Sequence, residues 1–155
     1  MKALPNRPSQ WGRTITKFLG ESARESPSFL IPSRFTGVND VTSALSGFLG
    51  NRNEEHLIVI HVSEHFENLQ FTCHRGNKTS VDAPTKKIIA DAVGLGTSGL
   101  ILAHNHPSGD PTPSKADLMF TRRLVEVCQE LDVSVLDHLI FGRDECVSLR
   151  RKGFL

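Results

Sequence analysis

A single continuous segment, LILAHNHPSGDPTPSKAD (residues 100–117), links a buried strand to the start of a helix. Its first residues are apolar and end in two histidines one residue apart. Turns rich in Gly and Pro follow, and then a capped helix start. We expect a strand over 99–104 and a helix from Ser114 to about Leu131. A strand that leads into a helix is a building unit of α/β domains, so the segment predicts this fold class.

The rest of the chain alternates strands and helices in the same way. Apolar or alternating runs predict further strands over 56–62, 69–74, 133–141 and 145–149. Strands interleaved with helices predict an α/β domain with layers in the order α-β-α around a central mixed β-sheet.

Two more helices are expected in this domain. One is capped by Asn39 or Asp40 and extends to about Arg52, and the other follows Asp82 and ends at Gly94 or Gly96. The residues expected on the buried faces of the three helices, in chain order, are Val41, Leu45, Phe48 and Leu49; Ile88, Ile89, Ala92 and Val93; and Leu118, Thr121, Leu124, Val125, Cys128 and Leu131.

The first 37 residues are expected to form an N-terminal extension, and residues 38–155 the α/β domain. One face of a short amphipathic helix in the extension carries Trp11, Ile15, Phe18 and Leu19. Two prolines then indicate a connector over 24–37. The amphipathic helix can dock on its own chain or on a second copy, so a homodimer is an open alternative.

The charge balance gives no strong field for nucleic acid or for an anionic membrane. The 155 residues carry a formal net charge of +1, and the basic clusters are as short as those of ordinary solvated surface. No apolar run reaches the roughly 18 residues of a membrane span, and no signal-peptide core is present. Cys73, Cys128 and Cys146 are odd in number and lack a C-x-x-C pair, which is typical of reduced thiols. We expect a cytoplasmic protein that does not bind membranes and whose cysteines are neither paired nor metal ligands.

The two histidines and a later aspartate have the spacing of a metal site. Residues i and i+2 of a strand point to the same face, so His104 and His106 can direct their imidazoles to one point while Asn105 points away. Asp117 lies in the first turn of the next helix, and its carboxylate leans back toward the helix N-terminus. Two imidazoles and one carboxylate, with a fourth position for water, form a ligand pattern of catalytic zinc. Iron, nickel and manganese can use similar ligands.

Each part of this motif also has a structural explanation. Ser114 with Asp117 three residues later is a capping box, the Gly/Pro-rich stretch is ordinary turn chemistry, and a lone His104 is most often a core residue. The combined spacing H-x-H-x₇-S-x₂-D favours the metal site, because a shuffled sequence would contain it roughly once in a thousand trials. Hydrolysis also requires a general base. Glu54 and Glu55, at the start of a predicted strand, are candidates that can equally be surface charges.

In order and spacing, these motifs resemble the JAB/MPN (JAMM) metalloproteases, and most closely their RadC-like branch. The residues that carry the resemblance are HNHPSG, PSKAD, Leu136-Asp137-His138 and Val147-Ser148 with Gly153. The resemblance covers about residues 38–155 and implies a zinc hydrolase fold related to cytidine deaminases. It also implies that Glu55, ahead of Glu54, is the general base and that Ser114 helps to stabilise the oxyanion.

The resemblance therefore implies a zinc-dependent metallopeptidase or isopeptidase. Metal-activated water would hydrolyse an amide bond of a protein or peptide substrate, with Glu55 as general base and with zinc on His104, His106 and Asp117. The alternatives are a DNA-associated accessory protein of the RadC type and a metal-binding scaffold without activity. A base deaminase would require a P-C-x-x-C motif, and another large protease class would require H-E-x-x-H; the sequence contains neither. For Asp137-His138 we favour a buried structural pair over a place beside the metal ligands.

Overall fold

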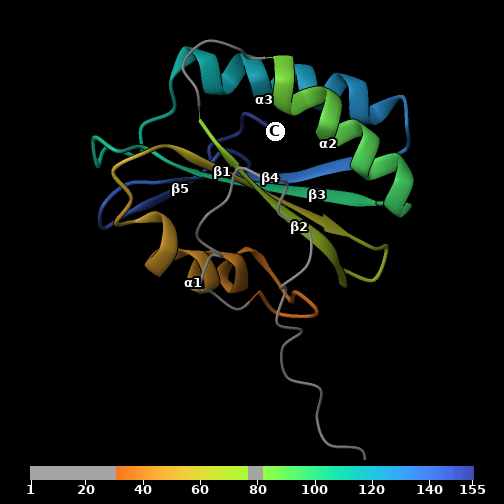
Figure 1. Ribbon diagram of the computed structural model, residues 1–155, viewed down its shortest axis with the longest axis horizontal. Helices are drawn as coiled ribbons and strands as arrows, with labels where there is room; N and C mark the ends of the chain where they lie inside the picture. The colour runs from red at the N-terminus through yellow and green to blue at the C-terminus, as the bar shows by residue number, and fades with distance from the viewer. Residues whose placement is uncertain (1–30, 77–81) are drawn as a thin grey trace, which may run out of the picture.

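The computed structural model describes residues 31–76 and 82–155, and the expected N-terminal amphipathic helix lies outside these residues. A central sheet carries helices on both faces, with α2 and α3 on one and α1 on the other (Figure 1). The predicted α-β-α layers are thus confirmed. The elements in chain order are α1 (Val38–Leu49), β1 (His56–Val62), β2 (Asn68–Arg75), α2 (Asp82–Leu95), β3 (Gly99–Asn105), α3 (Lys115–Gln129), β4 (Ser134–Phe141) and β5 (Cys146–Ser148).

The sheet is mixed, as predicted, and β3 lies at its centre. Its five strands follow the order β2-β1-β3-β4-β5. β1 pairs antiparallel with both β2 and β3, while β3 and β4 are parallel and are joined by the crossover helix α3. β5 returns antiparallel to β4. The carboxyl ends of β3 and β4 therefore lie at the same sheet edge as the beginning of β1.

Side chains of the central strands alternate between two apolar clusters, one on each face of the sheet. Ile101 of β3 packs with the buried residues of α1. Leu100 and Leu102 pack with Leu124 of α3 and with α2 on the opposite face. His104 continues the second series at two-residue spacing. The strand therefore directs His104 toward the face that α3 covers.

The start of α1 differs from the expectation. Gly37 is its N-cap, and neither Asn39 nor Asp40 caps it. The Asp40 carboxylate instead accepts hydrogen bonds from the backbone N–H and the hydroxyl of Thr36, at 2.7 and 2.8 Å. Asp40 thus orders the turn before the helix from a position inside the first helical turn.

Two residues predicted to lie in the core are exposed, because the face that each helix buries against the sheet is narrower or shorter than the apolar pattern of its sequence suggests. Ile88 and Ala92 of α2 are buried, whereas Val93, one step further round the helix, is 63% exposed. Leu131 is 40% exposed because α3 ends at Gln129 and the chain then turns back, so that Val133 reaches the core instead. Gly96 follows α2 with φ +63°, a left-handed conformation that favours glycine, and it is one of the two predicted helix ends.

The three cysteines lie on three different elements, β2, α3 and β5, and none is paired. Burial raises the pKa of Cys73, Cys128 and Cys146 to about 11 in each case, which keeps them as inert thiols. None of the helices among the described residues is long and apolar enough to cross a membrane.

His61 of β1 is fully buried and should make the stability of the fold sensitive to acid. Its Nδ1 bonds the Thr97 hydroxyl at 3.0 Å, and its Nε2 has no hydrogen-bond partner among the described residues. Burial lowers the pKa of His61 to about 4, with Asp91 opposing this shift and Lys87 and His74 reinforcing it. The unfolded chain therefore binds a proton on this histidine between pH 6.5 and 4 that the folded chain does not.

We accordingly expect the free energy of unfolding to fall by an extra ~2 kcal/mol from pH 7 to pH 5 because of His61 alone. Urea titrations at pH 7 and pH 5 measure this change in the free energy of unfolding. His61→Leu should remove the contribution of His61 to the change, whereas replacement of the exposed His65 by Leu should leave it. An equal loss of unfolding free energy between pH 7 and pH 5 in wild type and His61→Leu would show that His61 is not the cause.

Candidate metal centre

The end of β3 places His104 in a fully paired part of the sheet. His104 lies opposite Leu57 of the antiparallel β1 and opposite Ile140 of the parallel β4. Its side chain is 3% exposed and points to the α3 face. Backbone pairing on both sides leaves this imidazole little freedom to move.

His106 lies just beyond the strand and is held by the loop that follows. Its backbone N–H donates to the Phe141 carbonyl at 2.9 Å, and its Nδ1 lies 2.8 Å from the Asp110 carbonyl. A carbonyl can only accept, so Nδ1 of His106 carries the proton and Nε2 is left with its lone pair. The loop is itself attached to the β4–β5 turn, where the Arg143 N–H donates to the Gly109 carbonyl at 3.1 Å.

Asp117 is positioned by the predicted capping box. The Ser114 hydroxyl accepts from the Asp117 N–H at 3.1 Å, and the Asp117 Oδ2 accepts from the Ser114 N–H at 2.7 Å. The structural explanation of this pair is therefore correct, and it does not exclude a ligand role. The cap holds the carboxylate at the first turn of α3, directed toward the histidines.

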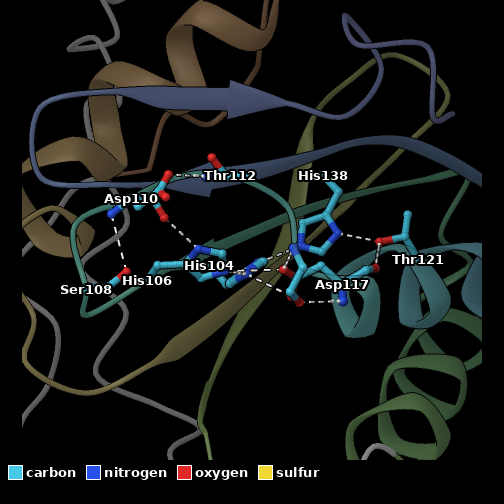
Figure 2. A network of polar contacts seen from close by, with 9 residues as sticks. His104, His106, Ser108, Asp110, Thr112, Asp117, Thr121 and His138 are labelled. Carbon is cyan, nitrogen blue, oxygen red and sulfur yellow. Dashed lines mark hydrogen bonds and ion pairs between the residues drawn. The ribbon is translucent and has the colours of Figure 1, made fainter.

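The three side chains meet at one point, as predicted (Figure 2). Nε2 of His104 lies 3.1 Å from Nε2 of His106. Oδ1 of Asp117 lies 3.2 Å from Nε2 of His104, and Oδ2 lies 3.3 Å from Nε2 of His106. The ligand atoms of all three lie within 4.8 Å of one another. His106 and Asp117 are 18% and 13% exposed, so the cluster opens to solvent on their side.

The chemistry of these atoms fits a divalent cation. Two imidazole nitrogens and a carboxylate oxygen face one another, and a cation can satisfy all three lone pairs at once. Burial alone would raise the pKa of the Asp117 carboxyl, but the neighbouring His104 imidazole and the hydrogen bonds with Ser114 outweigh it and hold the pKa well below its usual range. The carboxylate is therefore ionised, as a metal ligand must be.

The two candidate bases lie at the start of β1 in different surroundings. β1 runs antiparallel beside β3, and this register continues from Leu57 opposite His104 to Glu55 near His106. Leu57 packs on the α2–α3 face, and strand alternation assigns Glu55 to the same face. Glu54 instead forms an ion pair with Arg75 at 2.5 Å. Both glutamates are exposed.

Asn105 has a role that sequence reasoning missed. Its side chain points away from the ligands, as expected, and bonds the segment that leads into β1. Its Oδ1 accepts from the His56 N–H at 2.9 Å, and its Nδ2 donates to the Glu54 carbonyl at 3.0 Å. The residue between the two histidines thus holds the backbone on either side of Glu55.

Asp137 and His138 have separate roles, so the expectation of one structural pair holds for the aspartate alone. Asp137 accepts from the Ser148 hydroxyl at 2.6 Å, a bond that connects β4 to β5. It also accepts from the backbone N–H of His138 at 2.7 Å. His138 lies on the other face, and its Nε2 is 2.7 Å from Nδ1 of His104. Burial lowers the pKa of His138 to about 3, so this ring is neutral. One feature of the sequence points to this role of His138: it lies on the strand that follows the β-strand and helix of the metal motif.

A comparison with protein-family models agrees with this geometry. Residues 35–154 match the model described as the RadC-like JAB domain. The chain belongs to the RadC-like JAB family. The match contains every element of the described fold and all residues of the metal cluster.

Metal analysis tests the centre of this RadC-like domain directly. We expect purified protein to carry about one zinc per chain, a three-ligand site with an open position being typical of catalytic zinc. Mass spectrometry should find the metal content near zero in His104→Ala and in His106→Ala, because each removes one of three ligands. His65→Ala, at an exposed histidine in the turn before β2, is the matched control. Full zinc retention in the double variant His104→Ala/His106→Ala would contradict the site.

Gly142 provides a test of the loop that holds His106. A Cβ at Gly142 would lie 2.7 Å from Cδ of Pro111 and would also collide with the Gly109 carbonyl. Gly142→Ala should therefore displace the loop and loosen His106, with a zinc affinity lower by about 10-fold in chelator competition, as for lost second-shell support. Gly47→Ala, whose Cβ would meet nothing within 4 Å, is the control. Unchanged affinity in a folded Gly142→Ala protein would show that the loop does not position His106.

Proposed function

We propose that this RadC-like domain is a zinc-dependent metallopeptidase or isopeptidase that hydrolyses an amide bond of a protein or peptide. The observation that carries the proposal is the convergence of His104, His106 and Asp117 on one solvent-open point beside β1, which Glu55 directly precedes. Zinc held by these residues would supply Lewis acidity, which lowers the pKa of water to about 7 and polarises a carbonyl.

Glu55 is the proposed general base. It is exposed and directly precedes the strand next to His106. Unlike Glu54, which pairs with Arg75, it forms no ion pair with another residue that the structure describes. In this role its carboxylate takes a proton from the attacking water and later delivers it to the leaving amine. The hydrogen bonds of Asn105 to the flanking backbone restrict where that carboxylate can go.

Ser114 is proposed to stabilise the oxyanion. Its oxygen accepts from the Asp117 N–H, which leaves its own proton available for donation. Its position beside Asp117 at the N-terminus of α3 also places the positive end of the helix dipole near the developing charge.

The decisive experiment compares Glu55→Gln with Glu54→Gln in the zinc-loaded full chain. A library of linear and isopeptide-linked peptides serves as substrate. Glu55→Gln keeps the side-chain size and removes the base, so it should retain zinc and lower the rate of hydrolysis by about 10² or more. Glu54→Gln should change the rate little, because it breaks an exposed ion pair with Arg75.

The other outcomes separate the alternatives. A reversed order of the two variants would move the base to Glu54. Zinc binding without cleavage of any library member by the wild type would favour a metal-binding scaffold. DNA binding whose affinity falls steeply with salt would favour the alternative of a DNA-associated accessory protein, since a steep salt dependence indicates contacts with phosphates.

A further inference from the structure

A chain of buried hydrogen bonds connects the backbone of α3 to the ligand His104. The Thr121 hydroxyl lies 2.6 Å from the Asp117 carbonyl and 2.6 Å from Nδ1 of His138. Nε2 of His138 in turn lies 2.7 Å from Nδ1 of His104 (Figure 2). Thr121, His138 and His104 are each at most 3% exposed, so solvent has little access to these bonds.

The carbonyl at one end sets the direction of every proton in this chain. A carbonyl only accepts, so the single hydroxyl proton of Thr121 points to Asp117. The Thr121 oxygen must then accept from Nδ1–H of His138. A neutral imidazole with its proton on Nδ1 has a lone pair on Nε2, so His138 accepts from Nδ1–H of His104.

We propose that Thr121 and His138 are positioning residues that keep the proton of His104 on Nδ1 and thereby leave its Nε2 free for the metal. Nε2 is the atom that faces His106 and Asp117, at 3.1 and 3.2 Å. With the opposite tautomer, His104 would present an N–H to a cation and could not ligate it. The proposal deepens the proposed function, on whose metal site its affinity measurement rests.

The geometry of α3 makes this device specific. Thr121 follows Asp117 by one helical turn, so one stretch of helix supplies a carboxylate ligand and also sets the tautomer of another ligand. Phe120 packs edge-on against the His138 ring, with centroids 6.3 Å apart, and hinders its rotation. His106 obtains the same tautomer from the Asp110 carbonyl, so both histidines are prepared in the same way.

The test combines two measurements on the full chain. ¹⁵N NMR of the metal-free protein distinguishes protonated from unprotonated imidazole nitrogens, and competition with a chelator measures zinc affinity. Wild type should show His138 with its proton on Nδ1. Thr121→Val removes the acceptor for that proton, so the proton of His138 should move to Nε2 and zinc affinity should fall by 10- to 100-fold, as for other second-shell losses. Thr121→Ser keeps the hydroxyl and should restore both.

Thr97→Val is the matched control. It removes an equivalent buried hydrogen bond between a threonine hydroxyl and a histidine, that of His61, away from the metal cluster. It should therefore change stability without changing zinc affinity.

The proposal is overturned if wild-type His138 carries its proton on Nε2. That measurement requires neither a variant nor a metal. A folded Thr121→Val protein with wild-type tautomers and wild-type zinc affinity would also overturn it. Failure of the protein to hydrolyse any peptide would instead contradict the proposed function. It would not affect the proposed role of Thr121 and His138, because both readouts are independent of catalysis.

Discussion

Pairing of β3 with β1 on one side and β4 on the other determines where the polar groups on the strands of the site lie. The parallel pair puts His138 beside the strand that carries His104, and the antiparallel pair puts the start of β1 beside His106. Because side chains alternate along each strand, a shift of one residue in either register would point the side chains of the site toward the opposite face of the sheet, which α1 covers. The two deep apolar clusters that resist such a shift therefore also hold the three residues of the candidate metal centre in place.

Burial of so many polar groups beside an apolar core is expensive unless each is paired. Asn105, Thr121, Asp137 and His138 are almost completely buried, and each has hydrogen-bond partners from a different element. A buried polar group left without a partner costs roughly 1–3 kcal/mol. These bonds therefore specify one arrangement of β4, α3 and the β1 entrance, because any other arrangement leaves several groups unpaired at once. His61 is different: its Nε2 has no partner in the described part of the chain, and its burial makes the fold sensitive to acid.

The sequence carried the local part of this arrangement and little of the rest. Hydrophobic period and capping signals located the strands, the crossover helix and the three residues of the metal cluster, since each depends on spacing within 20 residues. The N-cap of α1 was misplaced because Asp40 bonds backward to Thr36, and Val93 was misjudged because exposure depends on how much sheet lies beneath the helix. The remaining groups act across strands, as Asn105 does toward the His56 N–H and His138 toward His104, and no local pattern encodes such contacts.

The connection between the ligands and the proposed base is the strongest reason to favour hydrolysis over a metal of purely structural use. Asn105 lies between two ligands, yet its hydrogen bonds go to the backbone of His56 and Glu54 and not to the ligands themselves. On the other side, the Glu55 carbonyl accepts from the Gly76 N–H at 2.8 Å, and a Cβ at Gly76 would come within 3.1 Å of the Glu55 Cβ. The segment that carries Glu55 is thus held between β2 and the ligand-bearing strand while its carboxylate is exposed. A structural metal site gains nothing from an exposed carboxylate on an anchored segment beside the strand of the two histidines, whereas a general base needs an anchored backbone and an accessible carboxylate to reach a bound substrate.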